Sequence, residues 1–157
     1  MSQSAVKEVR SVLIPLHELQ LLLPNAVIAE VIGYQQPEPT EEGAPDWLIG
    51  SFVWRGVIIP VVSFEGMLGK QVVLPGHRGR IMVMNTLGRH QKLTHVGLAV
   101  QAIPSLVRVS EENVVPLNIE DEYNPLIKQQ VELDLSEAII PDLDEIEQRL
   151  HSVLEQV

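Results

Sequence analysis

Prolines and glycines divide this chain into short apolar runs, and that division most limits the folds open to it. Eleven prolines and ten glycines are spread over 157 residues. From Ser11 to Ile32 the runs are rich in Val, Ile and Leu and are bounded by Pro15, Pro24 and Gly33. Short alternating runs of this kind favour strands, because proline and glycine interrupt helices. The pattern along the chain predicts an all-β fold of roughly nine short strands.

The clearest hairpin lies in WLIGSFVWRGVIIPVVSF. We expect two strands, Trp47–Trp54 and Val57–Val62, with Arg55 and Gly56 as the turn between them. Pro60 has no N–H for a β-ladder, so it should lie on an edge strand or at a bulge. An arginine in such an apolar run is unusual, because a buried and unpaired charge costs several kcal/mol. Arg55 therefore either faces water at the turn or contacts another molecule.

The segment VIAEVIGY is expected to be a strand with two mostly apolar faces. By alternation, Val27, Ala29 and Val31 would lie on one face and Ile28, Glu30 and Ile32 on the other. Glu30 is then either an acid at a strand end that reaches water or a contact residue. Farther along, Val131, Leu133 and Leu135 alternate with polar residues, which predicts a half-buried strand.

The C-terminal segment PDLDEIEQRLHSVLEQV changes period. Its apolar residues recur at three- and four-residue spacing: Leu143, Ile146, Leu150, Val153 or Leu154, and Val157. Asp142 and Glu145 are spaced as an N-cap and its reciprocal partner. Residues 141–157 should therefore form an amphipathic helix that packs on its own sheet, after a β domain of residues 10–140.

Charge is unevenly distributed along the chain, which has a net charge of -10. Residues 71–110 carry five basic side chains and no acidic one, whereas residues 111–157 carry two basic and thirteen acidic ones. Nucleic acid is not an expected partner, because no aromatics are interleaved with the basic residues and the chain as a whole repels phosphate. One alternative is open: Arg78, Arg80 and Arg89 could hold a small anionic ligand of a β-barrel enzyme or binding protein.

Motifs for chemistry are not found in the sequence. The chain has no cysteine, its five histidines lie in different segments, and its serines and glycines form no nucleophile elbow or phosphate loop. We therefore expect no enzymatic activity, no metal and no cofactor. No apolar run reaches the ~18 residues of a membrane span, and the N-terminus lacks a signal-peptide pattern. These features predict a cytoplasmic protein without direct membrane insertion.

A resemblance to a known family is carried by EVIGYQQPEP, PDWLIGSFVWRGVIIPVVSFEGMLG and VGLAVQAIPSLVRVSEENVVPL. In this order the segments resemble the CheW-like domain of bacterial chemosensory adaptors, over about residues 10 to 140. The resemblance implies two intertwined five-stranded SH3-like barrels. It also implies a non-catalytic adaptor that couples the cytoplasmic tip of a methyl-accepting chemoreceptor to the regulatory domain of a CheA-type histidine kinase.

The resemblance also suggests partner-binding residues. Carried over by position, these are Ile28, Glu30, Val31, Arg55 and Gly56. Trp54, beside the turn, could be either a core anchor or a contact residue.

Several positions depart from the family motifs. Val53 stands where the family has the asparagine of N-L-R-G, and Ser63 where it has an aspartate. These departures suggest a divergent member, which could serve a pilus-linked twitching-motility system. They also leave open an adaptor that keeps the kinase contact and has lost the receptor contact.

Overall fold

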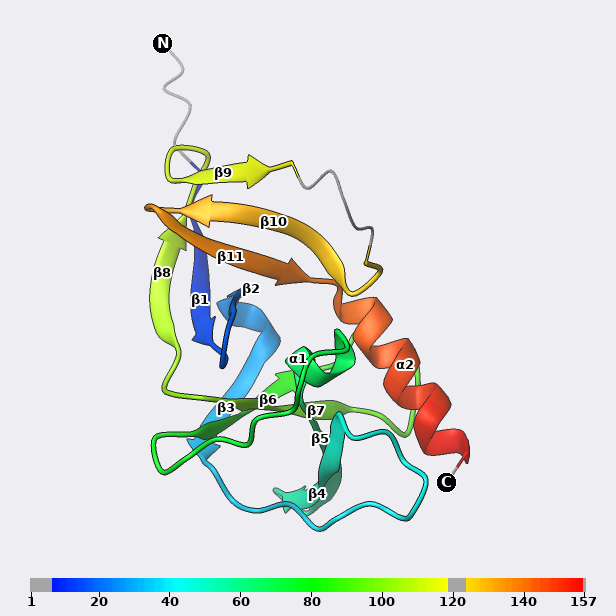
Figure 1. The fold of residues 1–157 in the computed structure, drawn as a ribbon. Coiled ribbons are helices and arrows are strands. Elements are labelled where there is room, and N and C mark those ends of the chain that lie inside the picture. The colour runs from blue at the N-terminus through cyan, green and yellow to red at the C-terminus, as the bar shows by residue number, and fades with distance from the viewer. Residues whose placement is uncertain (1–6, 119–123, 157) are drawn as a thin grey trace.

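The computed structural model describes residues 7–118 and 124–156 (Figure 1). The strands are β1 (Val9–Pro15), β2 (Gln20–Pro24), β3 (Ile28–Gly33), β4 (Leu48–Trp54), β5 (Val57–Val62), β6 (Arg80–Asn85), β7 (His95–Val100), β8 (Ser105–Val109), β9 (Val114–Leu117), β10 (Ile127–Leu133) and β11 (Ser136–Pro141). The helices are α1 (Phe64–Met67) and α2 (Leu143–Gln156), and η1 (Asn25–Val27) is a single 3-10 turn. No helix among these residues is both long and apolar enough to cross a membrane.

Two sheets interleave along the chain, as Figure 1 shows. The first sheet has the order β8-β1-β2-β11-β10-β9, and the second has the order β3-β6-β7-β5-β4. The N-terminal hairpin therefore pairs with strands from the end of the chain, and the middle of the chain forms the second sheet between them. The all-β class is confirmed. The second sheet has the expected five strands, while the described part of the first has six because β9 adds an outer strand.

The predicted hairpin turn is confirmed. Arg55 and Gly56 both have left-handed backbones, with φ of 49° and 79°, as a two-residue type I′ turn requires. The turn pairs Trp54 with Val57 and sets the register as far as Gly50 and Val61, beyond which the pairing shifts by one residue. Pro60 is not on an outer strand as expected, because β5 lies between β7 and β4. The β5–β7 ladder pairs only the last two residues of β5, so the missing N–H of Pro60 is not needed there.

The expected alternation in β3 is wrong, because the strand carries a β-bulge. The pairing of β3 with β6 shifts between Ile28 and Glu30. Ala29 and Ile32, predicted on opposite faces, both pack against the core of the second sheet. A bulge adds a residue on one strand and changes which residues share a face. The pairing register from Glu30 to Ile32 is continuous, so these two side chains lie on the same face of β3, as predicted.

The strand predicted through Leu135 is also wrong. β10 ends at Leu133, and β11 begins at Ser136. Asp134 and Leu135 form the turn, with φ of 47° and 72°, and Leu135 is 93% exposed. The polar and apolar alternation in VELDLSEAII thus belongs to two antiparallel strands and not to one.

Helix α1 is a single helical turn of four residues. The Ser63 hydroxyl caps it by accepting a hydrogen bond from the Gly66 N–H at 3.1 Å. Serine and aspartate are both good N-caps, so Ser63 keeps the capping capacity of the family's aspartate. Glu65, 7% exposed, accepts hydrogen bonds from the backbone N–H groups of His17 and Glu18, each at 2.8 Å. Through this carboxylate, α1 holds the β1–β2 turn of the first sheet.

The C-terminal helix is part of the domain's core. Ile146 and Leu150 are buried in the same cluster as β1, β2, β6 and β7 side chains, and Val153, not Leu154, continues the stripe. Val157 lies outside the described residues. The Asp142 carboxylate accepts a hydrogen bond from the Glu145 N–H at 3.1 Å, which confirms the predicted N-cap. The reciprocal contact is not formed, because the Asp142 N–H donates to the Leu126 carbonyl at 2.8 Å and the Glu145 carboxylate pairs with Arg149.

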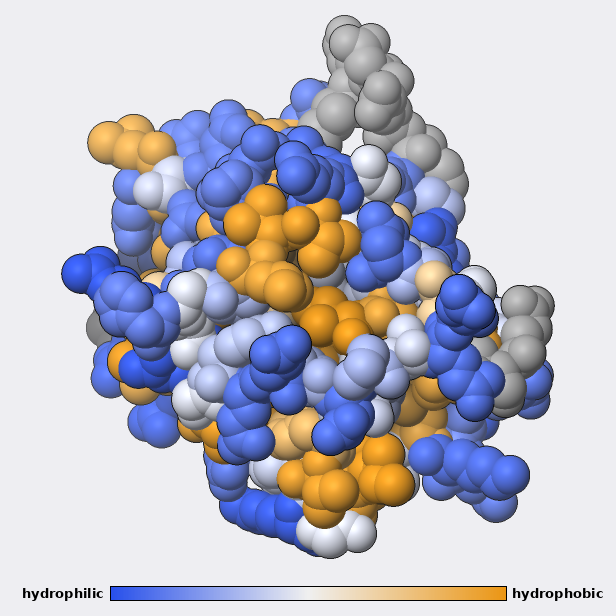
Figure 2. Space-filling view, turned by 60° about the horizontal axis from the view of Figure 1, so that its bottom comes forward, coloured by the Kyte–Doolittle hydropathy of each residue, from blue (hydrophilic) through white to orange (hydrophobic). Residues whose placement is uncertain are grey.

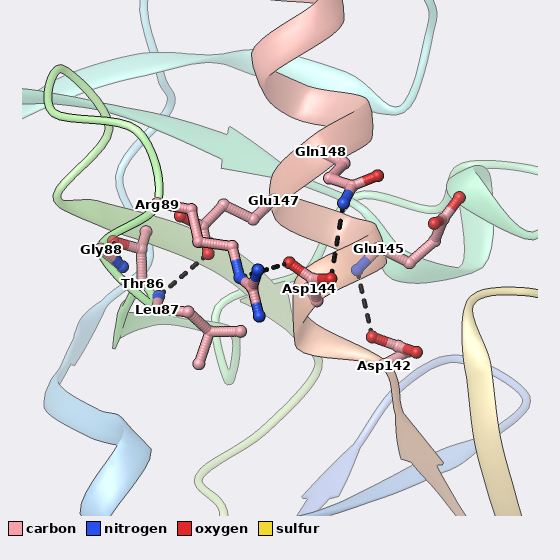
Figure 3. A network of polar contacts seen from close by, with 9 residues as sticks. All are labelled: Thr86, Leu87, Gly88, Arg89, Asp142, Asp144, Glu145, Glu147 and Gln148. Atoms are coloured by element: carbon pink, nitrogen blue, oxygen red, sulfur yellow. Dashed lines mark hydrogen bonds and ion pairs between the residues drawn. The ribbon is translucent and has the colours of Figure 1, made fainter.

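Polar contacts also hold α2 against the β6–β7 loop (Figure 3). The buried Glu147 carboxylate accepts a hydrogen bond from the Leu87 N–H at 2.9 Å. Arg89 pairs with Asp144 at 2.9 Å. The helix is therefore fixed to the second sheet by both apolar and polar contacts.

Candidate functional site

Three side chains meet where β3 passes the β4–β5 turn. The Arg55 guanidinium donates to Glu30 Oε1 at 2.7 Å, and the Trp54 indole N–H donates to Glu30 Oε2 at 3.4 Å. The Arg55 guanidinium carbon also lies 4.8 Å from the centre of the Trp54 ring, within cation–π range. We call these residues the Arg55 cluster: Glu30, Trp54 and Arg55.

The Arg55 cluster closes the second sheet. β3 and β4 are the two outer strands in the sheet order, yet Glu30 of β3 contacts the end of β4 directly. A sheet whose outer strands meet is curled on itself, as a small barrel is. The cluster's position thus follows from the fold and not from nearness in sequence.

Electrostatics keep the Glu30 carboxylate charged. Hydrogen bonds from Arg55, and then from Trp54, lower the pKa of Glu30 below its usual 4.5. The side chains of Arg55 and Glu30 are 66% and 33% exposed. A pair this exposed contributes little to stability. What the pair does is orient the guanidinium, whose other N–H groups stay accessible to a binding partner.

Exposed apolar residues adjoin the cluster. Val53 and Ile58 lie directly opposite each other on β4 and β5 and are 66% and 71% exposed, and the neighbouring Val57 is 43% exposed. Figure 2, which brings the β4 end of the molecule forward, shows hydrophobic residues reaching this surface among hydrophilic ones. Sequence analysis did not single out this pair. The signal was available, because a two-residue turn at Arg55 and Gly56 places Val53 opposite Ile58.

The structure brings together some of the predicted site residues and separates others. Glu30, Trp54, Arg55 and Gly56 lie together at the turn. Trp54 is a core residue, 8% exposed within the second core, and its indole N–H reaches Glu30. Its role as a partner contact stays a prediction. Two residues are outside the cluster: Ile28 packs against the first core, and Val31, 38% exposed, lies on the face opposite to Glu30 by strand alternation.

Two of the three arginines considered for an anionic ligand, Arg80 and Arg89, are engaged elsewhere. Arg89 pairs with Asp144 of α2. The Arg80 guanidinium donates to the carbonyls of Arg78 and Gly79. The alternative of a small anionic ligand bound by these three residues is therefore not favoured.

Comparisons with known proteins identify the family and the fold of the chain. A family model described as the CheW-like domain matches residues 10–150. The chain is 29% identical over 89 residues to the chemotaxis protein CheW of Rhizobium meliloti (strain 1021), a match covering 57% of this chain and 54% of that protein. It thus spans about half the length of this relative.

Among solved structures, the crystal structure of the scaffolding protein TtCheW from Thermoanaerobacter tengcongensis has the same fold. Its TM-score is 0.73, at 21% sequence identity over 91% of this chain and 90% of that one. The family model covers both sheets and most of α2. The chain belongs to the CheW-like domain family.

Proposed function

We propose that this chain is a non-catalytic adaptor of the bacterial cytoplasm that couples a methyl-accepting chemoreceptor to a CheA-type histidine kinase. Membership of the CheW-like family supports this proposal, as do the names of its similar proteins, a chemotaxis protein and a scaffolding protein. The departures from the family motifs leave both a pilus-linked motility system and the flagellar pathway open as its setting.

The observation that carries the proposal is the exposed Arg55 beside an apolar strip. Arg55 has a left-handed backbone, where Asn, Asp or Gly would be less strained. A strained backbone conformation at an exposed residue suggests that its side chain has a function. The oriented guanidinium and the Val53–Ile58 pair offer what protein interfaces use, an arginine anchor next to apolar surface.

Binding to purified partners tests the proposal. The regulatory domain of the kinase and the cytoplasmic fragment of the receptor would each be titrated with the wild-type chain and with Arg55→Glu. A micromolar affinity, about -8 kcal/mol, would be ordinary for such an adaptor. We expect Arg55→Glu to lose at least one partner, while circular dichroism and melting show an intact fold. Arg78→Glu, a charge reversal in another exposed loop, is the matched control and should bind normally.

The pattern of binding separates the alternatives. Wild-type binding to both partners supports the coupling role, and binding to the kinase alone supports an adaptor that has lost its receptor contact. Failure of the wild-type chain to bind either partner would refute the adaptor function, although the fold would stand. Equal binding by the wild type and Arg55→Glu would instead show that the interface lies away from the Arg55 cluster.

A further inference from the structure

A second candidate site lies on the first sheet, away from the Arg55 cluster. A pocket of about 370 Å³ opens where β1 meets β8. Its lining residues are Arg10, Ser11, Asn25, Leu106, Val107 and Arg108. We call it the β1–β8 pocket.

Two arginines face each other in this pocket. Arg10 of β1 and Arg108 of β8 are direct partners in the antiparallel register. Like charges directly opposite on neighbouring strands destabilise a sheet, and a guanidinium does not lose its proton to relieve the repulsion. Repulsion between Arg10 and Arg108 therefore destabilises the protein when no partner is bound.

The described residues compensate this repulsion weakly. Arg108 pairs with Glu8 at 3.6 Å, but the two side chains are 73% and 50% exposed, and such pairs contribute little. Arg10 forms no ion pair with any residue in ranges 7–118 and 124–156. The pocket therefore keeps an excess of positive charge in a chain whose net charge is -10.

Apolar surface borders the arginines. Leu106 is 76% exposed and, two residues before Arg108, lies on the same face of β8. β8 is also an outer strand of the first sheet. An inorganic anion or a phosphate backbone would satisfy the arginines but leave Leu106 exposed. A protein segment with an acidic and an apolar side chain would satisfy both.

We propose that the β1–β8 pocket binds an acidic segment of a partner protein. One carboxylate of the segment lies between the Arg10 and Arg108 guanidiniums, whose planar donor groups fit carboxylate oxygens. A neighbouring apolar side chain covers Leu106. This site goes beyond the proposed adaptor function, since its residues and its sheet differ from those of the Arg55 cluster and its binding is measurable without kinase or receptor.

Peptide titration followed by NMR tests the proposal. The probes are a blocked Glu-Leu-Glu-Leu peptide, the matched Gln-Leu-Gln-Leu peptide, and sulfate. We expect the Glu peptide alone to shift the side-chain signals of Arg10, Arg108 and Asn25, and added salt to weaken this binding. Arg10→Gln and Arg108→Gln should each weaken it at least about tenfold, since each removes a charge-assisted hydrogen bond to the carboxylate. Arg78→Gln should leave it unchanged.

The variants also test whether a loss of binding reflects a loss of structure. Removing one of two like charges should not lower the melting temperature of either arginine variant. Leu106→Gln provides a second, uncharged test, and we expect it to weaken binding of the Glu peptide although both arginines are kept.

Four results would overturn the proposal. The first is equal binding of the Glu and Gln peptides. The second is sulfate binding as tight as that of the Glu peptide, which would indicate a simple anion site. The third is unchanged peptide affinity in both arginine variants. The fourth is self-association of the wild-type chain that both variants abolish, which would identify the occupant as a second copy of this chain.

Discussion

Replacing Glu65 by alanine should weaken the attachment of one sheet to the other. The Glu65 carboxylate lies in α1, directly after the second sheet's β5, and accepts hydrogen bonds from two backbone N–H groups of the first sheet's β1–β2 turn. It is 7% exposed. A substitution there removes contacts between segments 47 and 48 residues apart in sequence.

The expected cost follows from these two hydrogen bonds. Hydrogen bonds to a charged group contribute about 1.5–3 kcal/mol each. His17 and Glu18 are exposed, so water can satisfy their N–H groups after the substitution, and the lower value applies. Glu65→Ala should therefore lower the free energy of unfolding by about 3 kcal/mol. Glu65→Gln should cost less, because its amide keeps one acceptor oxygen.

Urea denaturation and hydrogen exchange measure the effect at two scales. Denaturation reports the free energy of unfolding of the whole chain. Exchange at the His17 and Glu18 amides reports the local contact, and it should accelerate by about a hundredfold for a loss of ~3 kcal/mol. Glu18→Ala is the matched control in the same turn: its carboxylate is 61% exposed and pairs with Lys70 at 3.5 Å, so its loss should cost under about 0.5 kcal/mol.

Two results would refute this reasoning. One is a loss below about 1 kcal/mol in Glu65→Ala, which is less than a single charged hydrogen bond contributes. The other is an equal loss in Glu65→Ala and Glu18→Ala, which would show that the turn is held by its own residues. In either case the Glu65 carboxylate is not what holds the two sheets together.

Three further predictions test other parts of the structure. Gly50→Ala should destabilise the chain by about 2–3 kcal/mol in urea denaturation, because an added Cβ would collide with a backbone carbonyl of the loop that crosses β4; a loss under ~0.5 kcal/mol would show that this loop moves freely. Leu135→Gly should raise stability by about 1 kcal/mol, because a left-handed backbone strains leucine but not glycine; a lower melting temperature would contradict this. The lowered pKa of Glu30 means that its contribution to stability is complete above its usual value of 4.5 and is lost as pH falls through the lower folded pKa. The Trp54 indole N–H signal should therefore titrate with a midpoint below 4.5 that rises in Arg55→Gln, and an identical midpoint in the two proteins would disprove the ion pair.

Sequence analysis recovered the elements that local rules determine. A two-residue turn at Arg55 and Gly56 fixed a hairpin and its register as far as Gly50, and a change of period marked α2 with its cap at Asp142. Both depend on residues close together in the chain.

The contacts it missed depend on how distant segments meet. Glu30 and Arg55 are 25 residues apart and pair only because the second sheet curls until β3 reaches β4. The β3 bulge cannot be recognised from the pattern of apolar residues, because it is defined by the pairing of β3 with β6. Leu135 looked like a strand residue because a left-handed turn position normally carries Gly or Asn. The pattern of one sequence therefore does not predict the Glu30–Arg55 pair, the β3 bulge or the turn at Leu135.

The interleaving of the two sheets sets an order in which the chain can complete its structure during synthesis. Every strand of the second sheet lies between β3 and β7, so this sheet can form as soon as Val100 has left the ribosome. The β1–β2 hairpin emerges first but must wait for its neighbours, because Val9 pairs with Val109 and Leu21 with Ile139. At roughly 5–20 residues per second, that hairpin spends several seconds with both edges unpaired. The β1–β2 hairpin is thus made before the second sheet but completes its pairing after it.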